Sequence, residues 1–211
     1  MWNWQTALDV TSYGTSWRKY VPCDISVSDV MDTNTLRRYI ENRYCQTGIV
    51  NEYIGWVLDN VHADQIESDL EGLLGRPFLP GPINVYVTTF HRAPYDAKSH
   101  CLFSIQRVSE RARSITSIYH ELMHFVFHWY YWEPCRSAGL TDIETHSFKE
   151  SLTTLLNPLL IGRGLPLDSG YLQHQVLREK WDILWKESNM EFDVFFQKAL
   201  AEYLKIIRSN R

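Results

Sequence analysis

The segment His120–His124 reads HELMH, with its two histidines four residues apart. On an α-helix this spacing leaves the imidazoles about 40° apart around the axis and about 6 Å along it, so both can reach one ion. Glu121 points roughly 100° away from His120, where its carboxylate can act on a water molecule beside the metal. Zinc lowers the pKa of such a water, and a carboxylate can take its proton and later donate it to a leaving group. The pattern therefore predicts a hydrolytic zinc site.

The residues around this motif favour a buried helix. Leu122 and Met123, between the histidines, are uncharged, and Ile118 and Phe125 add to a strongly apolar character. A helix that carries an active site inside a protein needs this character. The composition of the segment therefore agrees with its chemistry.

A catalytic zinc ion usually has three protein ligands and leaves one position for water, so the histidine pair needs a third partner. His128 repeats the four-residue spacing. A helix places it about 12 Å along the axis from His120, too far to share one tetrahedral ion. We expect His128 to be a cleft or core residue instead.

The stretch SIYHELMHFVF, residues 117–127, resembles the metal-binding helix of the zincin metallopeptidases, which also place uncharged residues around the motif. In a zincin, a short edge strand before that helix borders the cleft and pairs with extended substrate, and Cys101–Arg107 lies in that place. The resemblance covers residues 83–160. The metzincin branch would require Gly and His where Phe127 and Tyr130 stand, which excludes it.

The gluzincin branch takes a glutamate ligand from a second helix twenty or more residues downstream, and resemblance to it makes Glu150 the expected third ligand. A small residue, Ser151, follows it, as is frequent in that family. His146, four residues earlier on the same helix face, is the alternative, because zinc accepts both ligand types. The family often has an aspartate four residues after the glutamate to orient an imidazole. Thr154 stands there, which leaves that partner open.

Peptide hydrolysis also needs a donor that stabilises the tetrahedral oxyanion, commonly a Tyr, His or Arg that faces the metal. Tyr171 and His174 follow the glycine-rich break Gly162–Gly170. A gluzincin-like fold could supply the donor from this place, so both are candidate catalytic residues. A surface loop is the alternative interpretation.

Hydrophobic periodicity gives an order of helices, a small sheet, then helices. Ser109 is the expected N-cap of the motif-bearing helix, and Glu133–Thr141 is expected to be irregular. The expected helices are Asn34–Tyr44, Glu52–Asn60, Ala63–Leu74, about Glu110–Tyr131, Ile143–Leu160, Gln175–Lys186 and Phe192–Ile207, and the expected strands are Ile83–Phe90 and Cys101–Arg107.

The predicted fold class is α+β: a zincin-like small antiparallel or mixed sheet, an active-site helix and a following ligand helix. The length of 211 residues and 45% hydrophobic content suit one compact domain or one domain with a subdomain. The break Gly75–Pro82 suggests a mainly helical part over residues 1–80 and a zincin-like catalytic part over residues 81–211.

Charge and hydropathy argue against nucleic acid and membrane partners. The formal net charge is -4 with no dense basic stretch, so we expect no nucleic acid partner. No stretch is apolar enough to span a bilayer and the opening MWNWQTALDV does not look like a secretory signal, so we expect no membrane partner. Four separated cysteines without a CxxC pair favour reduced thiols and a cytoplasmic protein. The oligomeric state stays open.

These features predict a zinc-dependent metallopeptidase that acts on a peptide or protein substrate, with Glu121 as general base. Two alternatives remain: a zinc-binding regulatory or interaction module without proteolysis, and a hydrolase of another amide or ester. The presence of Glu121 disfavours the module, because a structural zinc site has no need of that carboxylate.

Overall fold

The computed structural model describes residues 38, 42, 48–78, 81–88, 95–96, 101–105 and 110–209. Helices form most of these residues, and three short strands precede the longest helix, so the expected α+β class is met only loosely. In chain order the elements are α3 (Ile49–Asn60), α4 (Ala63–Leu74), β1 (Asn84–Thr88), β2 (Tyr95–Asp96), β3 (Cys101–Ile105), α5 (Arg111–Tyr130), α6 (Trp132–Ser137), α7 (Asp142–Leu152), η4 (Thr153–Leu156), α8 (Asn157–Gly162), η5 (Leu172–His174), α9 (Gln175–Glu187) and α10 (Phe192–Ser209).

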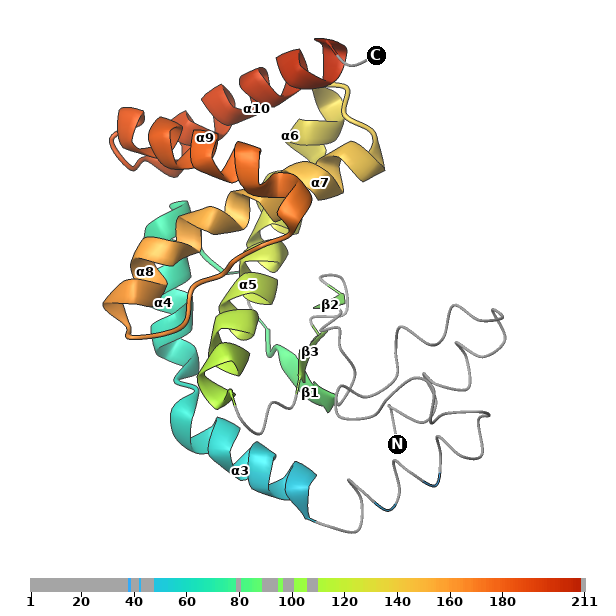
Figure 1. Cartoon of the computed structure of the whole chain (residues 1–211), viewed down its shortest axis with the longest axis vertical. Coiled ribbons are helices and arrows are strands. Elements are labelled where there is room, and N and C mark those ends of the chain that lie inside the picture. Colours follow the sequence, from blue (N-terminus) through green and yellow to red (C-terminus); the bar gives the residue numbers. More distant parts are fainter. Residues whose placement is uncertain are drawn as a thin grey trace.

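Helix α5, which carries the HELMH motif, runs through the middle of the molecule (Figure 1). It contacts α4 on one side and β3 on another. Ten of its residues are buried, which the apolar character of the segment predicts. Glu110 occupies the N-cap position, and Ser109, the expected N-cap, lies outside the described residues.

The three strands form one mixed sheet in the order β1-β3-β2. β3 pairs with β1 in parallel and with β2 in antiparallel, and Tyr95 and Asp96 lie opposite Leu102 and Cys101. The expectation that Cys101–Arg107 forms the edge of the sheet is therefore wrong. The two residues of β2 pair with the first two residues of β3.

The second helix of the predicted site is not continuous. The structure divides the expected Ile143–Leu160 helix into α7, the 3₁₀ turn η4 and α8. At its start, Thr141 and Glu144 form a capping box. Pro158, at the start of α8, has no N–H to donate to the carbonyl of Thr154, so a regular α-helix cannot continue through this point.

The segment expected to be irregular, Glu133–Thr141, is helical up to Ser137 and irregular after it, so that expectation is wrong for its first part. Helix α6 spans Trp132–Ser137, and its Pro134 lies in the first turn, where a missing N–H costs no hydrogen bond. Cys135 on this helix is fully buried in the core. Tertiary packing therefore overrides the polar local sequence here.

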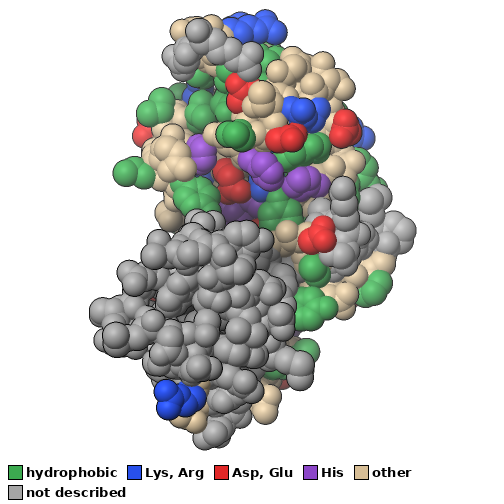
Figure 2. All heavy atoms as spheres, turned by 90° about the vertical axis from the view of Figure 1, so that its right-hand side faces the viewer, with side chains coloured by type: hydrophobic (Ala, Val, Ile, Leu, Met, Phe, Trp, Pro, Cys, Tyr) green, Lys and Arg blue, Asp and Glu red, His purple; other side chains and the backbone are tan. Residues whose placement is uncertain are grey.

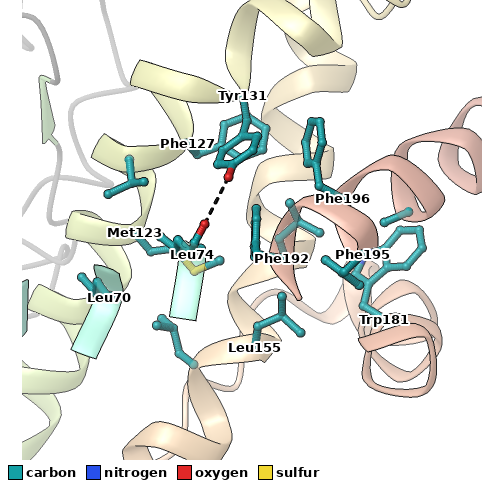
Figure 3. Packing of buried hydrophobic residues seen from close by; sticks show 14 of the residues in the cluster. Leu70, Leu74, Met123, Phe127, Tyr131, Leu155, Trp181, Phe192, Phe195 and Phe196 are labelled. Atoms are coloured by element: carbon teal, nitrogen blue, oxygen red, sulfur yellow. Dashed lines mark hydrogen bonds between the residues drawn. The ribbon is translucent and has the colours of Figure 1, made fainter. Parts of the chain in front are cut away.

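The core lies between α4, α5 and the C-terminal helices (Figure 3). The hydroxyl of Tyr131 lies 3.2 Å from the carbonyl oxygen of Leu74 and 2.9 Å from Asp193 Oδ1, which links α5 to both α4 and α10. Figure 3 labels the central side chains Leu70, Leu74, Met123, Phe127, Tyr131, Leu155, Trp181, Phe192, Phe195 and Phe196.

Helix α4 adds Ile66, Leu70 and Leu74 to this core, so the described part of residues 1–80 packs with the later helices. The division into parts 1–80 and 81–211 stays a prediction. The helix expected over Asn34–Tyr44 lies outside the described residues, apart from two single positions. In the described ranges, no helix combines the length and the apolar character that crossing a bilayer requires.

A pair of neighbouring residues on α10 tests this core. Phe195 is fully buried, whereas Val194 is 41% exposed. We expect Phe195→Ala to lower the free energy of unfolding by about 3–5 kcal/mol, because it leaves a cavity. We expect Val194→Ala, the control, to change it by less than about 0.5 kcal/mol. Urea unfolding followed by circular dichroism measures both, and equal losses would contradict this packing.

Candidate metal centre

The two motif histidines face the same point from adjacent turns of α5. Their Nε2 atoms lie 2.9 Å apart. His124 is almost completely buried, whereas 15% of the His120 side chain is exposed. Figure 2 shows histidine and acidic side chains gathered on one face of the molecule. The pair is thus accessible at one edge and enclosed at the other.

Glu150 on α7 closes the group. Its Oε2 lies 3.3 Å from His120 Nε2, and its Oε1 lies 3.2 Å from His124 Nε2. One ligand atom from each residue lies within 4.8 Å of the other two. The packing of α9 on α7 fixes this position, because Trp181 Nε1 donates to the hydroxyl of Ser151 at 2.8 Å. The structure therefore brings together the three residues predicted as ligands.

His146, the alternative third ligand, lies outside this group. Its ring packs at 4.7 Å from Trp132 and 6.1 Å from His128, measured between ring centroids. Among the described residues, only His120, His124 and Glu150 form a group of three such donors. The geometry favours Glu150 over His146.

The donor separations fit a zinc ion. Zn–N and Zn–O distances near 2.0–2.1 Å in a tetrahedron place neighbouring ligand atoms about 3.3 Å apart, close to the 2.9–3.3 Å found here. Two imidazoles and one carboxylate are also a ligand set typical of catalytic zinc. In addition, Glu150 Oε2 is buried and lies 3.3 Å from His120 Nε2. These residues can hold a divalent cation.

Asp168, which sequence reasoning missed, orients His120. Its Oδ1 lies 3.2 Å from His120 Nδ1, so the proton on Nδ1 leaves the lone pair of Nε2 directed at the ligand group. Burial would raise the pKa of Asp168, but the hydrogen bond and charge of His120, together with Thr153 and Arg178, lower it to about 2. Asp168 thus has the role that Thr154 cannot perform. Thr154 itself pairs with Asp182 at 3.0 Å.

Three side chains hold Asp168 in place. Its Oδ2 lies 2.6 Å from the Thr153 hydroxyl and 3.3 Å from Arg178 Nη1, and Asn157 Oδ1 accepts from its backbone N–H at 2.9 Å. Gly170 in the same loop has φ 59°, and a Cβ there would lie 2.6 Å from Arg178 Nη1. The glycine-rich break was the only signal of this loop in the sequence, and it specified no ligand partner.

Glu121, the predicted general base, has a pKa shifted by burial and by neighbouring charges. Burial raises its pKa to about 7; His120 and Lys149 oppose the rise, and Glu150 and Asp168 add to it. A base with a pKa near 7 exchanges protons readily at neutral pH. The charges of His120, Lys149, Glu150 and Asp168 thus all act on the Glu121 carboxyl group.

The two motif histidines have opposite pKa shifts. Burial and the positive charge of Lys149 lower the pKa of His124 well below its ordinary value. Burial also acts to lower the pKa of His120, but hydrogen bonds with Asp168 and Glu150 outweigh it and raise the pKa to about 10. Burial would raise the pKa of Glu150, yet its hydrogen bonds with both imidazoles hold it far below the usual range.

The predicted oxyanion donors differ in placement. Tyr171 is 55% exposed, whereas His174 is buried, and their ring centroids lie 6.1 Å apart. Burial lowers the pKa of His174. The negative charge of Glu150, a predicted ligand, acts to raise it. Their catalytic roles stay predictions.

A second group missed in the sequence adjoins the ligands. Tyr95 on β2 lies with its hydroxyl 2.5 Å from Lys149 Nζ and 2.8 Å from His128 Nε2. Lys149 Nζ also lies 3.0 Å from Glu150 Oε1, and the Tyr95 ring centroid is 5.3 Å from that of His124. No spacing rule connects β2 with α7, so only the fold could reveal this contact. His128, as expected, is not in the ligand group.

Two charge effects act on this second group. Burial raises the pKa of Tyr95 far above its ordinary value, and Glu121 and Glu150 raise it further, so the phenol keeps its proton. Burial lowers the pKa of Lys149, although Glu150 opposes this.

The chain matches no protein-family model, no curated protein and no solved structure. The interpretation of the site therefore depends on its geometry and chemistry.

The hydrogen bond between Asp168 and His120 gives a mutational prediction. We expect Asp168→Asn to weaken zinc binding about 10–100-fold, because His120 loses its orienting carboxylate. Competition with a fluorescent zinc chelator measures the affinity. Asp182→Asn is the matched control, since Asp182 also pairs with a threonine hydroxyl but touches no ligand. Equal effects of the two changes would contradict the role assigned to Asp168.

Zinc binding should also release protons. Below about pH 10 the metal-free protein holds a proton on His120 that a bound cation must displace, whereas His124 is already neutral. We therefore expect zinc affinity to rise about tenfold per unit of pH from about pH 6 to 8. Calorimetry in two buffers of different ionisation enthalpy counts the protons, and binding without proton release would contradict the assigned state of His120.

Proposed function

We propose that this chain is a zinc-dependent metallopeptidase of the gluzincin-like zincin type. The observation that carries the proposal is the convergence of His120, His124 and Glu150 into one group with donor separations of 2.9–3.3 Å. Glu121, which follows His120 in the chain, supports a catalytic site, because a purely structural zinc site has no use for an additional basic carboxylate.

The residues divide the chemistry of peptide hydrolysis between them. His120, His124 and Glu150 would hold zinc, which supplies Lewis acidity for the scissile carbonyl and lowers the pKa of water. Glu121 takes a proton from the attacking water and returns it to the amine that leaves. Asp168 keeps His120 in the tautomer that ligation requires.

The proposed substrate is a peptide or protein in extended conformation. Zincins pair such substrates with a strand beside the metal, and β3 and β2 lie beside α5 in the described residues. This support concerns the place of binding and leaves side-chain specificity open. We also propose a cytoplasmic location, supported by four cysteines without a CxxC pair.

Glu121→Gln separates metal binding from catalysis. We expect the variant to retain about one zinc per chain and to lose at least about a hundredfold in turnover, because the amide cannot accept the proton of water. Elemental analysis measures the zinc, and mass spectrometry of a random peptide library measures the cleavage. His120→Ala is the comparison variant, which should lose zinc and turnover together.

The outcomes distinguish three cases. Wild-type protein that holds no zinc, even after remetallation, would contradict the metal centre. Zinc in the wild type without cleavage of any peptide would favour a zinc-binding module. Unchanged turnover in Glu121→Gln would contradict the role of Glu121 as general base.

A further inference from the structure

The hydroxyl of Tyr95 lies where two donors can converge on it. Lys149 Nζ is 2.5 Å away and His128 Nε2 is 2.8 Å away. Lys149 is 2% exposed and also bonds Glu150 Oε1 at 3.0 Å, so its ammonium connects Tyr95 directly to a predicted ligand. Tyr95 itself is only partly buried, unlike Lys149. Tyr95 is therefore the more accessible of these two residues.

Hydrogen-bond capacity decides what the Tyr95 hydroxyl can do. A phenol has one hydrogen to donate and oxygen lone pairs that accept, whereas an ammonium only donates. Lys149 therefore occupies the oxygen as a donor. A His128 ring protonated at Nε2 donates as well, which leaves the hydroxyl hydrogen of Tyr95 for a third group.

The ring of Tyr95 lies beside the predicted ligand His124. The Tyr95 ring packs at 5.3 Å from His124 and 5.7 Å from Phe125, measured between ring centroids. Lys149 Nζ lies 4.6 Å from the centre of the same ring. Tyr95 is thus fixed on three sides by α5 and α7, the two helices that supply the ligands.

We propose that Tyr95 is the catalytic residue that stabilises the oxyanion, with Lys149 and His128 as its positioning residues. This inference rests on the proposed metallopeptidase function. Tyr171 and His174 stay candidate donors. Tyr95 differs from them because Lys149 connects its hydroxyl to the predicted ligand Glu150. Because Tyr95 belongs to β2 at the edge of the sheet, the strand region that would bind substrate also carries the donor.

The proposed hydrolysis needs no reactant other than the peptide and water. As water adds to the carbonyl carbon, the π electron pair moves to the carbonyl oxygen and Glu121 accepts the proton of water. Tyr95 donates a hydrogen bond to that oxygen and keeps its own proton. When the C–N bond breaks, the pair returns to form the carbonyl and the amine takes the proton from Glu121.

Binding of a tetrahedral anion to Co²⁺-loaded protein tests this role without turnover. Methylphosphonate presents oxygens like those of the oxyanion, and its binding is followed by the visible absorption of Co²⁺. We expect Tyr95→Phe to raise its dissociation constant about 10–100-fold, the range for a lost hydrogen bond to a charged acceptor. Binding of imidazole, which offers no oxygen, should change by less than about twofold in the same variant.

Tyr130→Phe is the matched control, because its hydroxyl donates to the carbonyl of Pro77 at 2.8 Å, away from the ligand group. It should leave the affinity for both probes unchanged. Unchanged methylphosphonate affinity in Tyr95→Phe would overturn the role of Tyr95 and leave the metal centre intact. Loss of Co²⁺ by Tyr95→Phe would overturn it too, since the residue would then be structural. Failure of the wild type to bind Co²⁺ would overturn both proposals.

Discussion

The candidate site depends on one carboxylate that contacts two imidazoles, one buried and one partly buried. Glu150 lies 3.3 Å and 3.2 Å from nitrogens that are themselves 2.9 Å apart. Polar groups enclosed this closely are stable only when a proton or a cation pairs them. Helix packing enforces the contact, because Phe148 and Ser151 beside Glu150 are fully buried. The other charged groups of the site are arranged around this contact.

Two sets of side chains make the histidines different from each other. Asp168, held by Thr153 and Arg178, favours positive charge on His120. On the other side, the Lys149 ammonium disfavours positive charge on His124. The two imidazoles of one motif therefore differ in protonation. His120 favours the protonated form, whereas His124 favours the neutral form that can bind a metal. The asymmetry comes from α7, α9 and the loop before η5, not from the motif.

Local sequence predicted helices best where apolar periodicity was strong and packing agreed with it. Helix α4 has the predicted bounds, and α5 begins within one residue of its expected start. The predictions failed where a distant contact or a single residue decided the structure. Buried Cys135 accompanies a helix in a polar segment, and Pro158 interrupts a helix whose hydrophobic pattern continues through it. The sheet order failed as well, because strand pairing is not a local property.

The sequence by itself determined the histidine pair and Glu121, because the 3.6-residue repeat of a helix fixes the relative directions of residues one to four positions apart. Resemblance to the gluzincins added Glu150. Only the tertiary structure selected Glu150 over His146, and only it placed Asp168, Lys149 and Tyr95 around the ligands. These residues come from a loop, a neighbouring position on α7 and a two-residue strand. No sequence interval sets distances between separate elements, since those distances follow from how the helices pack.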